Sequence, residues 1–229
     1  MKLTFGEKVI EYNKQLDFTG ELPEGFYVLN PYTDNPETWV VMQQFYRKYY
    51  HDHQIRKLLI GINPSRNGAG VTGVPFTDTK RLESVCGIPM SSAHTHEISS
   101  VFMYEMIEAF GGATSFYSQF YINSPFPLAI VKKSAKGNWV NTNYYDDKQL
   151  FYCLKEFMVQ TLKAHINMGI DTTEAFVLGK KNARYIHQLN QEEKLFKKLT
   201  VLEHPRYIQQ YKSKEKQLYI DSYLQTLLS

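Results

Sequence analysis

The stretch from residue 58 to residue 76 constrains the fold of this chain more than any other. It opens with the apolar run Leu58-Leu59-Ile60, which predicts a strand buried on both faces of a sheet. The run gives way within three residues to Asn63-Pro64 and then to a glycine-rich segment, which predicts a binding loop at the end of the strand. The prolines of the segment exclude a continuous helix. A buried strand followed by such a loop indicates an α/β fold.

Three later stretches repeat the pattern of a short apolar run that ends in polar residues. They are 120–122, followed by Asn123, 175–178, followed by Gly179-Lys180, and 199–203, followed by His204-Pro205. Helical stretches lie between these runs, so we predict a three-layer α/β/α fold around a central, mostly parallel sheet of four or five strands. The carboxyl ends of parallel strands meet at one edge of the sheet. We therefore expect Asn63, Asn123, Lys180 and His204 to lie close together.

The length of 229 residues fits one domain, with an N-terminal helical part at 1–57 and a motif-bearing core at 58–229. Glycine, proline and serine predict a loop over 81–96. A second loop, basic and aromatic, is predicted around Lys132, Lys133, Lys136 and Trp139, and Asp146 is expected to cap the helix that follows.

The composition excludes several classes of protein. Cys86 and Cys153 lie far apart and form no Cys-x-x-Cys pair, which argues against a disulfide scaffold, a structural zinc site and an iron–sulfur cluster. The net charge of +3 permits a nucleic-acid partner without demanding one. The 17 tyrosines and 14 phenylalanines serve either a core or a stacking surface. No apolar run has membrane-spanning length and no signal-peptide pattern opens the chain, so we expect a cytoplasmic protein without a membrane partner.

Several residues match metal or nucleotide motifs in part. Gly68-x-Gly70-x-x-Gly73 has the dinucleotide spacing, but Asn63-Pro64 separate it from the strand, and no Gly-Lys-Ser/Thr follows for a P-loop. The pair His51 and His53 lacks a third ligand nearby, and His94-Thr95-His96-Glu97 lacks the spacing that places two imidazoles on one helical face. We expect no metal and no cofactor.

The strand-end residues have the groups to recognise and cleave a nucleoside. An Asn carboxamide presents an acceptor beside a donor, which complements N3–H and O4 of uracil, whereas cytosine has that pair reversed. A second Asn can hold a water, a His can donate to a developing anion, and Phe76 can stack on a base. This set suits hydrolysis of an N-glycosidic bond, in which the pyrimidine leaves with negative charge on its oxygens.

The motifs themselves resemble those of a known family. Gly61-Ile62-Asn63-Pro64, followed by Thr72-Gly73-Val74-Pro75-Phe76, resembles the first motif of the uracil-DNA glycosylase superfamily, especially of its single-strand-selective monofunctional branch. Tyr121-Ile122-Asn123 is similar to that branch's base-recognition strand, and His204-Pro205 to its second catalytic motif. The chain departs from the branch at Ser65-Arg66, where Gly-Pro is usual, and at Arg206-Tyr207, where Ser-Pro and a wedge residue are usual.

The resemblance implies a monofunctional DNA glycosylase of base excision repair, which flips out a deaminated base and hydrolyses its glycosidic bond. Uracil is the expected base, and xanthine and hydroxymethyluracil are left open. Asn63 would position the attacking water, and His204 would stabilise the leaving anion. The base would lie against Gly61, Ile62, Pro64, Gly73, Phe76 and Asn123.

The implied partner is DNA, single-stranded or double-stranded, bound by a monomer. The expected DNA contacts are Ser65, Arg66, Lys180, Pro205, Arg206 and Tyr207, with Lys132, Lys133, Lys212 and Lys214 as further cations for the backbone. Lys180 could instead serve Schiff-base lyase chemistry or be a solvated lysine. Two other functions remain open: a catalytically weak nucleic-acid-binding module of the same fold, and a small-molecule nucleotide hydrolase.

Overall fold

Helices and strands alternate along the computed structural model, which describes residues 2–229. The strands are β1 (Phe26–Leu29), β2 (Arg56–Ile60), β3 (Phe120–Asn123), β4 (Ala129–Lys133), β5 (Trp139–Asn141), β6 (Ile170–Leu178) and β7 (Lys198–Leu202). The longer helices are α1 (Phe5–Gln15), α3 (Pro36–Tyr49), α6 (Ile98–Ala109), α8 (Lys148–Gly169), α9 (Lys180–Glu193) and α11 (Lys216–Leu227). The shorter ones are α2 (Pro31–Asp34), α4 (Ala69–Thr72), α5 (Thr79–Ser84), α7 (Gly112–Gln119) and α10 (Pro205–Tyr211), with a 3-10 turn at Ser213–Glu215.

Four strands form a parallel sheet in the order β3-β2-β6-β7. Leu58 in β2 pairs with Tyr121 on one side and with Ala175 on the other, and all three side chains are buried. The four strands expected from the apolar runs are confirmed, and because they run in the same direction, their carboxyl ends share one edge of the sheet.

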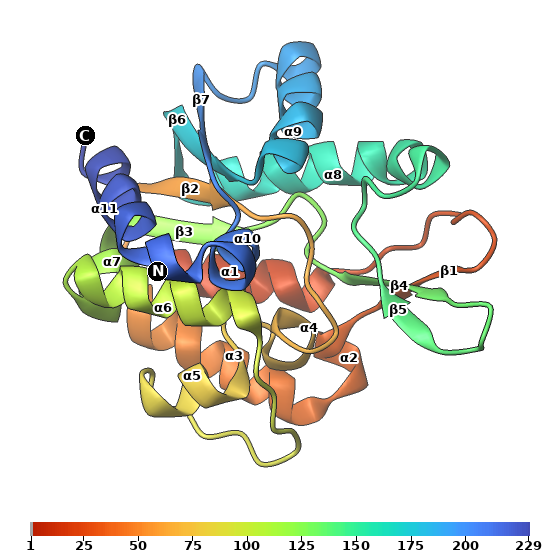
Figure 1. Ribbon diagram of the computed structural model, residues 1–229, viewed down its shortest axis with the longest axis horizontal. Coiled ribbons are helices and arrows are strands. Elements are labelled where there is room, and N and C mark those ends of the chain that lie inside the picture. The colour runs from red at the N-terminus through yellow and green to blue at the C-terminus, as the bar shows by residue number, and fades with distance from the viewer. Residues whose placement is uncertain (1) are drawn as a thin grey trace.

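Helices cover both faces of this sheet (Figure 1). Helices α8 and α9 lie on one side, whereas α3, α6 and α7 lie on the other. The expected three-layer α/β/α fold is therefore confirmed. Among the helices within residues 2–229, none combines the length and the apolar character that a membrane crossing requires.

Aromatic side chains supply much of the core on the α3 side. Tyr46, Tyr50 and Tyr121 are each 1% exposed or less, and the Tyr50 hydroxyl donates to the backbone carbonyl of Phe120 at 3.1 Å. Other tyrosines are exposed, among them Tyr207 at 42%. The high tyrosine content thus serves both the core and the surface.

A second, antiparallel sheet in the order β1-β4-β5 corrects two expectations. The predicted basic and aromatic loop around Lys132 and Trp139 is a β-hairpin, in which Lys133 pairs with Trp139. The N-terminal part is not wholly helical, because β1 pairs with β4 through Tyr27 and Val131. β1 and β4 lie far apart in the sequence, and β5 has only three residues and depends on its pairing with β4, so local periodicity does not identify these strands.

Two smaller expectations are also wrong. The predicted loop over 81–96 begins inside helix α5, because Asp78 accepts the backbone N–H of Arg81 at 2.9 Å and caps that helix. The N-cap of α8 is Asp147 rather than Asp146, with Oδ1 accepting from the backbone N–H of Leu150 at 2.9 Å. Asp146 instead pairs with Lys181.

Candidate active site

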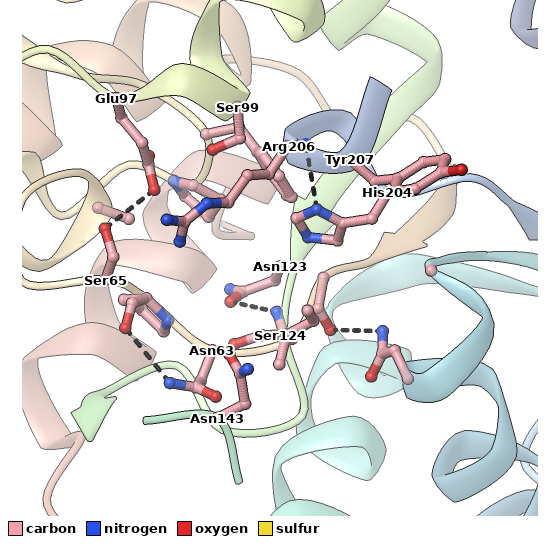
Figure 2. Close-up of a pocket in the computed structure, with 18 of the residues that line it drawn as sticks. Asn63, Ser65, Glu97, Ser99, Asn123, Ser124, Asn143, His204, Arg206 and Tyr207 are labelled. Carbon is pink, nitrogen blue, oxygen red and sulfur yellow. Dashed lines mark hydrogen bonds between the residues drawn. The ribbon is translucent and has the colours of Figure 1, made fainter. Parts of the chain in front are cut away.

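The carboxyl edge of the parallel sheet opens into a cavity of about 570 Å³. The four strand-end residues expected to converge, Asn63, Asn123, Lys180 and His204, all line it. Figure 2 shows Asn63, Asn123 and His204 around the same space. Other predicted residues in its lining are Gly61, Ile62, Pro64, Ser65, Gly73, Phe76, Arg206 and Tyr207. Arg66, which is exposed, and Pro205, which is buried at the start of α10, lie outside the lining. The further cations expected for the DNA backbone, Lys132, Lys133, Lys212 and Lys214, also lie outside it.

The segment after β5 holds the side chain of Asn63. Its Oδ1 accepts from the backbone N–H of Tyr144 at 3.0 Å, and its Nδ2 donates to the backbone carbonyl of Thr142 at 3.0 Å. A backbone donor and a backbone acceptor therefore determine which way the carboxamide points. Oδ1 retains a second lone pair, which can accept a hydrogen bond from a water in the cavity.

A buried network also supports the backbone that leads to Asn63. The Tyr144 hydroxyl donates to Oδ1 of Asn182, and Nδ2 of Asn182 donates to the carbonyl oxygens of Ile60 and Gly61 at 3.1 Å each. Tyr144 and Asn182 are both 0% exposed. Because unpaired buried polar groups are costly, this network holds the strand end and its loop in one arrangement.

Asn123 lies on the floor of the cavity and is 5% exposed. Its Nδ2 donates to the Tyr121 hydroxyl, and its Oδ1 accepts from the backbone N–H of Ser124 at 2.8 Å. A primary amide has two N–H donors and two lone pairs on its oxygen, so one of each remains. A carboxamide that offers one donor and one acceptor can match the N3–H and O4 edge of uracil.

His204 follows β7 and is the N-cap of α10. Its Nδ1 accepts from the backbone N–H of Arg206 at 3.2 Å, which leaves the imidazole proton on Nε2. Burial, aided by the Arg206 charge, lowers the pKa of His204 to about 4. The ring is therefore a neutral N–H donor at pH 7. Gly179 makes room for it, since a Cβ there would lie 3.2 Å from the Cβ of His204.

Phe76 has a left-handed backbone conformation, with φ of 53°. Such a conformation costs a bulky residue of order 1–3 kcal/mol and persists only when the surroundings enforce it. The ring lies 5.8 Å from the His204 ring, centroid to centroid. A Cβ at Gly61 would lie 3.2 Å from Phe76 Cε2, so glycine at 61 allows the ring to lie against the strand end.

The Thr-Gly-Val-Pro-Phe motif is a tightly bonded turn that presents Phe76. The Thr72 hydroxyl donates to the carbonyl of Thr77 at 2.6 Å. Gly73 has φ of 69°, and a Cβ there would lie 2.7 Å from Cε1 of Tyr32, whose hydroxyl donates to the Gly73 carbonyl. Position 73 therefore requires glycine for both its conformation and its neighbour.

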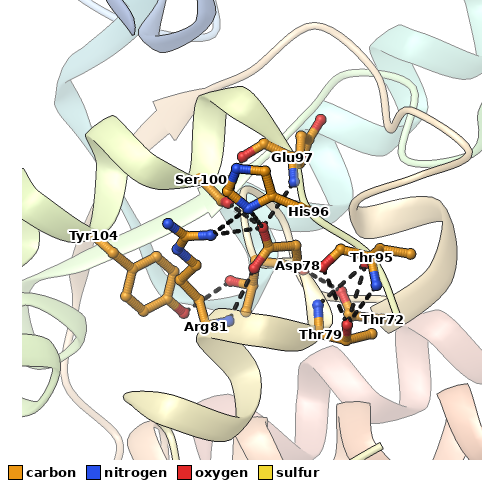
Figure 3. A network of polar contacts seen from close by, with 10 residues as sticks. Thr72, Asp78, Thr79, Arg81, Thr95, His96, Glu97, Ser100 and Tyr104 are labelled. Atoms are coloured by element: carbon orange, nitrogen blue, oxygen red, sulfur yellow. Dashed lines mark hydrogen bonds and ion pairs between the residues drawn. The ribbon is translucent and has the colours of Figure 1, made fainter. Parts of the chain in front are cut away.

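One carboxylate in the lining, Glu97, was not predicted as a functional residue. Ser65 Oγ donates to its Oε1 at 2.9 Å, and burial raises the pKa of Glu97. Its backbone N–H donates to Oδ2 of Asp78 at 2.7 Å. Asp78 is 0% exposed, and Figure 3 shows it at the centre of a network that also includes Arg81 and Ser100. This network connects the starts of α5 and α6 and places Glu97 at the cavity.

The predicted cations separate into paired and unpaired groups. Lys180 forms an ion pair with Glu203, which raises the pKa of its amine, and Lys212 pairs with Glu215 at 3.2 Å. No ion pair within residues 2–229 includes Arg66, Lys132, Lys133, Lys214 or Arg206. Figure 2 shows the Arg206 side chain reaching over the cavity toward Ser65 and Glu97.

One histidine of each pair has another polar neighbour. Nδ1 of His51 lies 3.3 Å from the backbone carbonyl of Lys48, and Nδ1 of His96 lies 2.8 Å from the Arg81 guanidinium. No group of three or more His, Cys, Asp or Glu side chains within residues 2–229 is arranged to hold a metal ion.

Sequence reasoning missed Tyr144, Asn182 and Glu97. Asn182 follows Gly179-Lys180-Lys181, so a signal was present, but the lysines of this segment suggested phosphate contacts instead. Tyr144 and Glu97 follow no strand of the central sheet. The position of Tyr144 beside Asn63 depends on the segment after β5, and the position of Glu97 at the cavity depends on the Asp78 network. Neither arrangement has a local sequence pattern.

Comparison with known proteins places most of the chain in one family. The model of the uracil DNA glycosylase superfamily matches residues 47–228. The crystal structure of wild-type SMUG2 from Pedobacter heparinus is similar with a TM-score of 0.96 and 48% sequence identity, over 98% of this chain and 97% of that one. A search among curated proteins found no match.

Proposed function

We propose that this chain, which belongs to the uracil DNA glycosylase superfamily, hydrolyses the bond between a deaminated base, first of all uracil, and its deoxyribose. Its membership and its similarity to SMUG2 identify it as a DNA glycosylase. The proposal concerns the base, the roles of the residues and the monofunctional reaction. The observation that carries it is that Asn63, Asn123 and His204 line one cavity, each with a hydrogen-bonding group still available.

Base recognition is assigned to Asn123 and Phe76. The remaining Nδ2 donor of Asn123 would bond O4 of uracil, and the remaining Oδ1 lone pair would accept N3–H. Cytosine would place a donor against a donor and leave buried groups unpaired, which discriminates strongly. Phe76 would stack on the flat face of the extruded base.

Bond cleavage is assigned to Asn63 and His204. As the glycosidic bond breaks, its electron pair stays on the base, and the Nε2–H of His204 donates to O2 where this charge develops. The Oδ1 of Asn63 orients a water toward C1′, where the water oxygen forms the new bond. The attacking water loses one proton and the base anion takes up one, so the products are the neutral free base and an abasic site.

The DNA strand would pass over the cavity at α10. Arg206 has no ion-pair partner within residues 2–229 and is available to a phosphate. Tyr207 is exposed at the rim and would fill the gap left by the flipped base, with Arg206 as the alternative.

Lys180 is less suited to lyase chemistry, because its ion pair with Glu203 favours the protonated amine over the neutral nucleophile. We further propose that the chain acts as a single domain and as a monomer.

The test is incubation with single-stranded and double-stranded oligonucleotides that contain one uracil, followed by alkali. We expect alkali-labile sites, and none with cytosine at the same position. Strand breaks without alkali would indicate a lyase. Binding without abasic sites would support the binding module instead, and release of uracil from deoxyuridine monophosphate but not from DNA would support the small-molecule hydrolase. Xanthine and hydroxymethyluracil in the same oligonucleotides would define the range of bases.

A further inference from the structure

The antiparallel sheet carries an open aromatic and basic face beside the cavity. Tyr27 pairs with Val131, which pairs with Asn141, and Lys133 pairs with Trp139. Paired residues in neighbouring strands, and residues two apart within one strand, point to the same side of a sheet. We name the set Tyr27, Lys133, Trp139 and Asn141 the aromatic face.

The two rings of this face are packed together and yet accessible. Tyr27 and Trp139 are 47% and 39% exposed, and their ring centroids lie 4.9 Å apart at an interplanar angle of 85°. The Lys133 Nζ lies 5.6 Å from the centroid of the Trp139 ring. Two adjacent exposed rings beside a lysine combine a flat apolar surface with a positive charge, which is the composition of a surface that binds flat, anionic ligands.

The aromatic face is joined to the cavity by direct contacts. Asn141 Oδ1 accepts from the backbone N–H of Arg66 at 3.1 Å, and Thr142, the next residue, accepts from Asn63 Nδ2. The same strand therefore holds the loop with Arg66 and the proposed catalytic side chain. A DNA strand with one base in the cavity would therefore pass over Arg66 and reach Trp139.

The charge of this region favours a nucleic acid over a protein. Neither Arg66 nor Lys133 takes part in an ion pair within residues 2–229, whereas Lys180 and Lys181 at the start of α9 are paired with Glu203 and Asp146. Unpaired cations that alternate with exposed rings are typical of surfaces for single-stranded nucleic acids, in which bases stack on the rings and cations hold the phosphates. Bases inside a duplex have no free face for such stacking.

We propose that the aromatic face is a second DNA site, on which an unpaired base of the DNA strand that flanks the flipped nucleotide stacks on the Trp139 ring and meets the perpendicular Tyr27 ring edge-on. Arg66 and Lys133 hold the phosphates between the two positions. This inference rests on the proposed function only for the identity of the nucleotide in the cavity. It predicts that the chain binds single-stranded DNA more tightly than duplex of the same length.

The test is binding to fluorescein-labelled single strands with one uracil, lengthened stepwise on the 5′ or on the 3′ side. For the wild type, we expect the affinity to rise at the length at which the 5′ or the 3′ extension reaches the aromatic face. Tryptophan fluorescence should be quenched at the same length. Trp139→Ala should abolish the rise and weaken binding of the long strand by about fivefold to 100-fold. Trp139→Phe, which keeps a ring, should retain it. Lys133→Ala should reduce the salt dependence by about 0.7 in log–log slope.

The matched control is Val140→Ala. Val140 is 51% exposed in the same strand and pairs with Lys132, so its side chain lies on the other side of the sheet. Equal binding by wild type and Trp139→Ala at every length would overturn the proposal, as would an equal loss on single strands and duplex. A loss of the single-turnover rate at saturation would also overturn it, because the effect would then lie in the cavity. The binding signal does not require cleavage of the DNA. A failure to form abasic sites would therefore refute the proposed function, and the test of the aromatic face would still stand.

Discussion

Nδ1 of His204 accepts the backbone N–H of Arg206, so one hydrogen bond both starts helix α10 and determines the tautomer of the imidazole. With Nδ1 occupied as an acceptor, the proton lies on Nε2. Burial lowers the pKa of this ring to about 4, which keeps it neutral at pH 7. The N-cap of a short helix and the proposed donor to the leaving base are therefore the same side chain.

His204→Ala should slow cleavage of uracil-containing DNA by about 10²–10³, the usual loss for one donor to a developing oxyanion. The measurement is the single-turnover rate constant at saturating enzyme. His187→Ala, an exposed histidine in α9, is the control and should cleave at the wild-type rate. A rate within twofold of wild type for His204→Ala would remove this residue from the mechanism.

Titration of His204 should cause no change in the cleavage rate around neutral pH, because the ring stays neutral there. Because the pKa of His204 is lowered to about 4, the neutral donor persists well below the ordinary histidine range. We expect a decline only as the pH approaches 4, where protonation of Nδ1 also breaks the bond from Arg206. The measurement is the single-turnover rate constant between pH 4 and pH 8. A decline with its midpoint near the ordinary histidine value would contradict the proposed state of the ring.

His165→Phe should make stability less dependent on pH. Burial lowers the pKa of His165 to about 3, so the unfolded chain binds a proton more readily than the folded chain does. The stabilising contribution of the neutral ring is therefore full above the ordinary histidine pKa and is lost as the pH falls below it. From pH 7 to pH 5 this ring should account for a loss of about 2 kcal/mol. Phenylalanine can keep the edge-to-face contacts with Tyr12 and Tyr121. Urea unfolding at both pH values measures the difference, and an unchanged dependence would refute the prediction.

Asn123→Asp should abolish the preference for uracil over cytosine, since a carboxylate cannot donate to O4. Cleavage of matched oligonucleotides with uracil or cytosine at the target position measures it. Asn143→Asp adds the same charge elsewhere in the lining and should keep the preference. Unchanged discrimination by Asn123→Asp would mean that another group reads the base.

Tyr144→Phe should destabilise the fold by about 1–3 kcal/mol, because it leaves the buried Oδ1 of Asn182 without its donor. Chemical denaturation measures the change. Tyr145→Phe is the neighbouring control: the Tyr145 hydroxyl donates no hydrogen bond within residues 2–229, and its removal should stay within about 0.5 kcal/mol. Equal stability of the two variants would show that the network contributes little.

Much of the fold could be predicted because its signals are local. The apolar runs at 58–60 and 175–178 identified two neighbouring strands of the parallel sheet, since strands buried on both faces need continuous apolar side chains. The hairpin β4–β5 was missed because β5 is three exposed residues whose conformation depends on pairing with β4. Helix α5 was missed because its length of six residues provides little periodicity.

The chemical groups at the candidate site, and the edge of the sheet at which they meet, follow from the sequence alone. Asn63, Asn123 and His204 each lie at or just after the end of a parallel strand, and parallel strands have one carboxyl edge. Which of their atoms remain free for a ligand depends on hydrogen bonds that form only in the folded chain. The bond from Tyr144 to Asn63 spans 81 residues, and the bond from Asn182 to Gly61 spans 121. Contacts between segments so far apart follow no local pattern, because they depend on how the folded layers bring those segments together.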